Sequence, residues 1–244
     1  ALDGMNYGLH YERLLLQGDN APRNLLGDNV YTHQELALAY AHAGLYDEAA
    51  QLLAAAPPVD PMTAYYLGYV YAQAGAEDAA RLAFARAAAM PPDYCFPNQY
   101  ECVAALQTAM RWNPADARPP YYLGNFWYAH RCHDDAIAAW EEARRLDPTF
   151  PTTQRNLGIA YANQRGDLAA ARQCYAAALA LDPSDARVLF EADQLAKKLG
   201  APPSERLALL KQHAQLVDQR DDLTVEYVTL LNLAGEHAAA LARA

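Results

Sequence analysis

The sequence lacks the features that mark membrane-spanning, disulfide-stabilised and zinc-stabilised proteins. No apolar run approaches the roughly eighteen residues that a membrane helix needs, and the first residues lack the basic start and apolar core of a signal peptide. The four cysteines are scattered without any C-x-x-C spacing, which argues against a disulfide framework and a structural zinc site. We therefore expect no membrane partner and a reducing, cytoplasmic location.

Positive charge and catalytic motifs are also scarce. The chain has 19 Lys and Arg against 29 Asp and Glu, a net charge of −10, whereas a protein that binds a phosphate backbone needs a dominating cationic face. There is no glycine-rich phosphate loop, no G-x-S-x-G elbow and no H-E-x-x-H motif. We expect no nucleic-acid partner, no cofactor and no enzymatic activity.

Two groups of polar residues resemble functional sites only superficially. The adjacent carboxylate pairs, such as Asp134 with Asp135, do not face each other on a helix and so form no acid/base dyad. His130, Cys132 and His133 crowd one turn, but tetrahedral zinc needs a fourth ligand and usually a different spacing. We expect solvated helix surfaces and a surface turn instead, with no metal.

What the sequence does contain is an internal repeat. Leu-Gly, an aromatic three residues after the glycine, then alanine, aromatic, alanine and proline recur at nearly constant spacing, as in helix-turn-helix repeats. The three best copies are Leu67, Gly68, Tyr71, Ala80, Phe84, Ala87 and Pro92; Leu123, Gly124, Trp127, Ala136, Trp140, Ala143 and Pro148; and Leu157, Gly158, Tyr161, Ala171, Tyr175, Ala178 and Pro183.

Each landmark has a packing role. The glycine lets the two helices of a pair approach closely, and we expect the first alanine of the second helix, such as Ala80, to meet it. The proline ends the second helix before the next pair begins. The third copy carries one extra residue in its turn at residues 164–167.

These landmarks divide the chain into five regions and predict an all-helical fold of helix pairs. The pairs are expected near 29–57, 61–90, 117–147, 151–182, 186–217 and 221–244, with Asn98 to Trp112 as a second helix that lacks a first. In that helix Cys102, Leu106 and Ala109 stand where the second half of the motif would put them. The regions are an N-terminal helical cap or remnant of a preceding region at 1–28, two repeats at 29–92, a connector and orphan helix at 93–116, two repeats at 117–185, and two degenerate repeats at 186–244, the last one truncated. Residues 1–27 should form two short helices. Because the chain starts without methionine and stops inside a helix, we expect a piece of a longer protein.

The motif residues resemble the tetratricopeptide repeat family over about residues 29–244. The resemblance implies a right-handed superhelix of helix pairs that binds proteins on its concave face. Segments 116–125, 155–161 and 220–227 further resemble the C-terminal repeat region of large bacterial proteins that carry a sugar-mutarotase-like domain of unknown function. If so, carbohydrate chemistry belongs to the part of such a protein outside this chain.

In this family the concave face is lined by first-helix residues at fixed offsets from the glycine, and these offsets form one stripe at helical spacing. The stripe becomes aromatic at one end and basic toward the other. Arginine forks suit carboxylates, so the expected partner is a protein or peptide segment that carries acidic groups, or another domain of the same parent chain. The candidate groove residues are Tyr65, Tyr69, Arg118, Tyr121, Asn125, Tyr128, Arg155, Asn156, Arg187 and Phe190.

Three interpretations of this stripe remain open. Asn125 and Asn156 resemble part of the carboxylate clamp of chaperone-binding family members, although Tyr121 stands where that clamp has lysine, which argues against strict capture of a peptide C-terminus. Alternatively, the chain is an accessory region of a carbohydrate-active enzyme whose Tyr65, Tyr69, Tyr121 and Tyr128 stack on a sugar. The third interpretation is that the arginines are ordinary surface cations and the tyrosines only pack.

Overall fold

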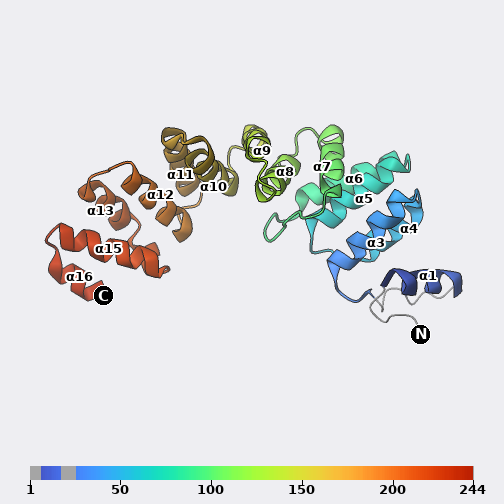
Figure 1. The fold of residues 1–244 in the computed structure, drawn as a ribbon, viewed down its shortest axis with the longest axis horizontal. Helices are drawn as coiled ribbons and strands as arrows, with labels where there is room; N and C mark the ends of the chain where they lie inside the picture. The colour runs from blue at the N-terminus through green and yellow to red at the C-terminus, as the bar shows by residue number, and fades with distance from the viewer. Residues whose placement is uncertain (1–6, 18–25, 244) are drawn as a thin grey trace. The chain divides into compact units, whose positions relative to one another are not determined.

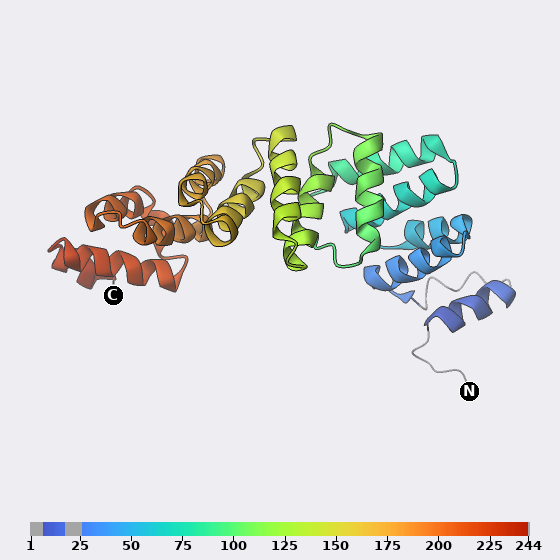
Figure 2. The ribbon, with the colours of Figure 1, turned by 45° about the horizontal axis from the view of Figure 1, so that its top comes forward.

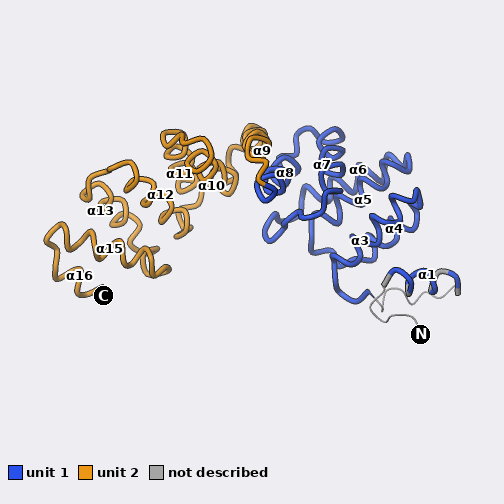
Figure 3. Tube along the Cα trace, viewed as in Figure 1, with its two compact units in different colours: residues 1–130 blue, residues 131–244 orange. Residues whose placement is uncertain are grey.

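The computed structural model describes residues 7–17 and 26–243, and every regular element in these ranges is a helix. The chain divides into two compact units, residues 1–130 and 131–244 (Figure 3). The predicted all-helical fold is therefore confirmed for the described residues, while the division at residues 28, 92, 116 and 185 stays a prediction. Within these same ranges no helix is long and apolar enough to span a membrane.

The described part of the first unit is built from two helix pairs and three further helices, α1, α7 and α8 (Figure 1). Its α3 packs against α4 and α5 against α6, and α1 lies against α3 through ring contact of Tyr11 with Tyr40. The second short helix expected before residue 28 falls largely on residues 18–25, outside the described ranges. The helices are α1 (Tyr7–Gln17), α3 (Val30–His42), α4 (Tyr46–Ala55), α5 (Pro61–Gln73), α6 (Glu77–Ala89), α7 (Glu101–Trp112) and α8 (Arg118–Ala129).

The second unit continues the same pattern. Two of its helix pairs are α10 with α11 and α15 with α16, whereas α13 packs on α15 as well as on α12. The elements are α9 (His133–Leu146), α10 (Pro151–Ala160), the π-helical turn η1 (Tyr161–Arg165), α11 (Leu168–Leu181), α12 (Ala186–Lys198), α13 (Pro203–Gln212), α14 (Ala214–Val217), α15 (Asp221–Leu233) and α16 (His237–Arg243). The helices of both units thus fall within the ranges that the motif spacing predicts.

Local sequence explains where the helices begin. The side chain of Asp60 accepts a hydrogen bond from the backbone of Met62, and Asp185 accepts from the first turn of α12, so each carboxylate satisfies amides that a helix leaves unpaired. Proline occupies the first turn of α5 and α10, where its missing amide costs nothing. Capping side chains and prolines therefore explain where α5, α10 and α12 begin.

The turn inside most pairs requires a left-handed residue. Gly44 and Gly75 have φ angles of 78° and 75°, a conformation that glycine adopts without a steric penalty. At the corresponding position between α8 and α9 the chain carries Arg131, whose φ is 62°. This turn is therefore strained, because a side chain with a Cβ disfavours that conformation.

Paired helices approach each other closely at the motif glycines Gly68 and Gly158, where an aromatic ring of the second helix supplies the nearest atoms. A Cβ added to Gly68 would lie 2.5 Å from Cε1 of Phe84, and at Gly158 it would lie 3.2 Å from the ring of Tyr175. That Ala80, which is fully buried, also meets Gly68 stays a prediction. The atoms nearest to the glycine belong to Phe84, one helical turn further along the second helix.

The extra residue in the third motif copy is absorbed by η1. In the first copy Gly75 follows the motif glycine Gly68 by seven positions, whereas in the third copy Gly166 follows Gly158 by eight. The π-helical turn before Gly166 widens the helix by that one residue, and the amide of Asp167 then bonds back to the carbonyl of Tyr161 at 3.0 Å. The downstream helix α11 keeps its place beside α10.

Residues 91–97 form an irregular connector, as their prolines predict, and α7 follows it without a paired first helix. Figures 1 and 2 show α7 beside the α5–α6 pair, and it packs on both α5 and α8. Its buried residues include the predicted Cys102, Leu106 and Ala109, together with Ala105 and Thr108. The orphan helix therefore fills the place of a repeat half within the first unit.

Candidate functional site

Two of the candidate tyrosines belong to the core of the first unit. The side chain of Tyr65 is 0% exposed, and its hydroxyl donates a 2.7 Å hydrogen bond to Oδ2 of Asp116. Its ring meets that of Tyr122 edge-on, with the ring centres 6.0 Å apart, and Tyr121 is also buried. Burial raises the pKa of Tyr65 far above its ordinary value. Neither Tyr65 nor Tyr121 is therefore available to a partner or a sugar.

The other candidates on α5 and α8 are partly accessible. Tyr69, Arg118, Asn125 and Tyr128 are all half-buried. These four lie in the first unit, whereas Arg155, Asn156, Arg187 and Phe190 lie in the second. Their role in binding stays a prediction.

In the second unit, Arg155 is already paired with a carboxylate of this chain. Its Nε and Nη2 donate hydrogen bonds of 2.9 and 2.5 Å to the two carboxylate oxygens of Glu191, which joins α10 to α12. Both side chains are largely buried, at 14% and 19% exposed. A bidentate pair of this kind fixes orientation as well as charge, so Arg155 serves first to hold Glu191 in place.

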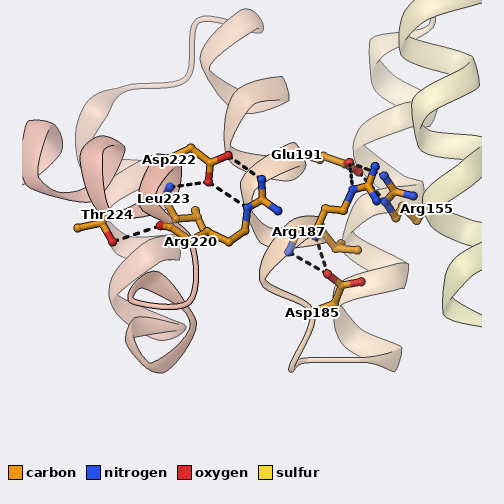
Figure 4. A network of polar contacts seen from close by, with 9 residues as sticks. Arg155, Asp185, Arg187, Glu191, Arg220, Asp222, Leu223 and Thr224 are labelled. Atoms are coloured by element: carbon orange, nitrogen blue, oxygen red, sulfur yellow. Dashed lines mark hydrogen bonds and ion pairs between the residues drawn. The ribbon is translucent and has the colours of Figure 1, made fainter.

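Arg187 differs from Arg155 because most of its guanidinium remains open. It lies one helical turn before Glu191 on α12, and only its Nε reaches that carboxylate, at 3.3 Å. Its side chain is 62% exposed, and within the described residues its two terminal nitrogens have no hydrogen-bond partner. Figure 4 shows Arg187 and Arg155 converging on Glu191.

Phe190 lies close to the guanidinium of a second arginine, Arg220. The guanidinium of Arg220 stands over the Phe190 ring, 5.4 Å from its centre. Figure 4 shows the two hydrogen bonds of 2.9 and 2.6 Å that Arg220 donates to Asp222. The hydrogen bonds from Arg220 lower the pKa of Asp222, so that carboxylate stays charged beside it. We call the surface formed by Arg155, Arg187, Phe190, Glu191 and Arg220 the α12 face.

A buried ionic cluster lies on the same helix and anchors the α12 face. Asp193 is 0% exposed and accepts 2.9 and 2.6 Å hydrogen bonds from Arg206 of α13. Arg206 also donates to Glu226 of α15, which accepts a further bond from Lys197. Although burial alone would raise the pKa of Glu226, the bonds from Lys197 and Arg206 lower it. The cluster thereby joins α12, α13 and α15 through ionised groups.

The sequence stripe missed Glu191, Asp193, Arg206 and Arg220. Its fixed offsets selected cations and aromatics and left out the carboxylates that neutralise them. One signal was present, since Glu191 stands four residues after Arg187 and such a pair shares one side of a helix. The longer-range pairs join different helices and have no signature in the local sequence.

The turn with His130, Cys132 and His133 shows no metal geometry. Across residues 7–17 and 26–243, no three side chains of His, Cys, Asp or Glu come together as a potential metal site. His130 instead stacks near Phe126, with ring centres 4.1 Å apart, and its Nδ1 lies 2.9 Å from the Phe126 carbonyl.

Repeated helix pairs and closely packed motif glycines together define a helical-repeat protein. No family model matches the chain. Over 112 residues, 44% of its length, the chain is 32% identical to tetratricopeptide repeat protein 37 of Xenopus laevis, and it spans 7% of that protein's length. This match confirms the resemblance to tetratricopeptide repeat proteins, while the resemblance to bacterial proteins with a mutarotase-like domain stays a prediction.

Several solved structures resemble the chain at low sequence identity. PilF of Pseudomonas aeruginosa is 18% identical, with 87% of each chain covered and a TM-score of 0.47. A thermophilic tetratricopeptide protein of Thermus thermophilus is 19% identical over 83% of this chain and 99% of that one, with a TM-score of 0.45. MamA of Desulfovibrio magneticus is 16% identical over 80% and 99%, also with a TM-score of 0.45.

Proposed function

We propose that this chain is a non-catalytic protein-interaction scaffold that binds an acidic segment on its α12 face. The segment belongs either to another protein or to a further part of a longer parent chain. The observation that carries the proposal is Arg187, an exposed guanidinium whose terminal nitrogens have no partner within the described residues. Such a fork matches the two oxygens of a carboxylate.

The surroundings of Arg187 support a prepared surface. Glu191 holds its Nε, and Arg155 in turn holds Glu191, so little side-chain freedom remains to be lost on binding. Half-buried Phe190, one turn from Arg187 on α12, adds apolar contact area. The chain's own carboxylates neutralise Arg155 and Arg220, which leaves Arg187 as the group that a partner would engage.

The carbohydrate-binding alternative loses support from the fold. Two of its four stacking tyrosines, Tyr65 and Tyr121, are buried in the first unit. Stacking on a sugar requires an exposed ring face. Tyr69 and Tyr128 remain half-buried candidates for either kind of partner.

A peptide titration tests the scaffold proposal. A fluorescent glutamate-rich peptide should bind the whole chain at low salt, and Arg187→Ala should weaken binding by about fivefold to tenfold. Arg172→Ala is the matched control, because Arg172 is an equally exposed arginine, paired with Glu205, on the second helix α11. If the control weakens binding as much as Arg187→Ala, or if the wild-type chain does not bind, the proposal is wrong.

A further inference from the structure

A second surface, of opposite charge, lies in the first unit between α3 and the start of α7. It is a groove of about 370 Å³. Apolar side chains of α3 form part of its wall, and polar side chains stand on both sides. We call it the α3–α7 groove, and it is lined by Glu35, Leu38, Ala39 and His42 of α3 together with Gln99, Tyr100 and Glu101.

Three side chains of the α3–α7 groove carry acceptor atoms that have no donor within the described residues. The carboxylates of Glu35 and Glu101 have no ion pair or hydrogen bond within the described residues. The side-chain oxygen of Gln99 is buried and also has no hydrogen-bond partner there. A buried acceptor left unpaired is costly, so a ligand that brings donors gains more here than on an open surface.

The charge of the unit favours a cation in this place. Residues 1–130 hold 13 Asp and Glu but only 6 Arg and no Lys. The excess negative charge attracts cationic segments over several ångströms before contact is made. The α12 face of the second unit, by contrast, offers an open arginine.

An aromatic platform stands at the rim of the groove. Tyr100 is 69% exposed, yet its ring is held edge-on by Phe126 at 5.4 Å and by His130 at 5.0 Å between ring centres. A fixed, exposed ring beside two carboxylates is the arrangement on which a guanidinium stacks.

The connector that leads to Tyr100 turns further aromatic rings to solvent. Cys95 is buried and its thiol lies 3.5 Å from Oδ1 of Asp60, while its neighbours Tyr94 and Phe96 are 92% and 68% exposed. Tyr94 also has a φ of 59°, an unfavourable backbone conformation for a residue with a large side chain. Strain and exposed aromatic area that do nothing for the core are typical of a contact surface.

We propose that the α3–α7 groove binds an arginine-bearing segment of a partner protein. The guanidinium stacks on Tyr100 and donates to the carboxylates of Glu35 and Glu101. Arginine fits better than lysine because its planar group combines several fixed donors with a face that stacks on a ring. The chain then carries two docking surfaces of opposite preference.

Synthetic peptides test this proposal on the whole chain. An arginine-rich peptide should bind more tightly than its lysine counterpart, by fluorescence anisotropy at low salt. Glu35→Gln with Glu101→Gln should weaken binding of the arginine peptide by about tenfold. Tyr100→Ala should remove the preference for arginine over lysine.

The controls separate a specific groove from general attraction to an acidic protein. Asp47→Asn with Asp78→Asn removes two charges from exposed first turns of α4 and α6 and should leave binding unchanged. Arg187→Ala should also leave binding of the arginine peptide unchanged. A failure of the groove proposal would therefore not count against the proposal for the α12 face. Either of two results would overturn the proposal. One is that the control pair weakens binding as much as Glu35→Gln with Glu101→Gln does. The other is that the Glu35→Gln, Glu101→Gln variant binds the arginine peptide as tightly as the wild-type chain and melts at the same temperature.

Discussion

The hydroxyl of Tyr65 donates a 2.7 Å hydrogen bond to Asp116, which stands 51 positions later in the chain. The bond links α5 to the turn that precedes α8, and the other oxygen of Asp116 accepts from the amide of Arg118 at 2.9 Å. Burial raises the pKa of Asp116, although the bonds from Arg118 and Tyr65 oppose the rise. The charged form of the Asp116 carboxylate is therefore less favourable in the core of the first unit than it would be in water.

The raised pKa of Asp116 predicts that the free energy of unfolding depends on pH. Because the pKa of Asp116 is raised above its ordinary value of 3.8, its charge destabilises the fold above the raised pKa, and the penalty disappears as pH falls below 3.8. Asp116→Asn removes the penalty, since an amide can accept from Arg118 and donate to the oxygen of Tyr65. Urea unfolding should therefore show a more favourable effect of the substitution at pH 7 than at pH 3.5. An effect independent of pH would contradict the prediction.

Residues of the first unit show how far the sequence could predict this molecule. The repeat landmarks located the helices because caps, prolines and small residues act within a few positions, and Cys102, Leu106 and Ala109 even placed the orphan helix. The burial of Tyr65 could not be predicted, because the residue that receives its hydrogen bond lies in a distant turn. The fixed offsets of a regular array assume that the first-helix stripe stays open, and here α8 with its preceding turn covers part of it.

The buried ion pair of Asp193 with Arg206 predicts that removing one of the two partners strongly destabilises the fold. Asp193→Ala leaves the guanidinium of Arg206, which is 7% exposed, without its bidentate partner. We expect a loss of about 3 kcal/mol in the free energy of unfolding, because the buried guanidinium keeps its bond to Glu226 but loses both bonds to Asp193. The double variant Asp193→Leu with Arg206→Met should recover much of the loss, since it replaces both charges with apolar groups. Chemical denaturation followed by circular dichroism measures both, and a loss below about 1 kcal/mol for the single variant would refute the prediction.

The two motif glycines predict unequal responses to alanine. At Gly68 a Cβ would lie 2.5 Å from the buried ring of Phe84, which must shift, so Gly68→Ala should destabilise by about 1–3 kcal/mol. At Gly158 the nearest ring atoms of Tyr175 are 3.2 Å away, and the gain in helix propensity of about 1 kcal/mol offsets the closer contact. Gly158→Ala should therefore be nearly neutral in a thermal melt. If both variants melt alike, the close contact at Phe84 does not limit packing as we infer.

The turn between α8 and α9 predicts a stabilising substitution. Arg131 has a φ of 62°, where Gly44 and Gly75 occupy the equivalent turns at 78° and 75°. A left-handed conformation costs a residue with a Cβ about 1–2 kcal/mol. Glycine adopts this conformation without strain, and its disadvantage is the larger conformational entropy that it loses on folding. Arg131→Gly should therefore raise the free energy of unfolding by about 0.5–1 kcal/mol. Arg131→Ala is the control, because it removes the same charge and keeps the Cβ, and it should bring no gain. Equal stabilisation by the alanine and glycine variants in urea unfolding would show that the guanidinium, and not the backbone angle, is the source of the strain.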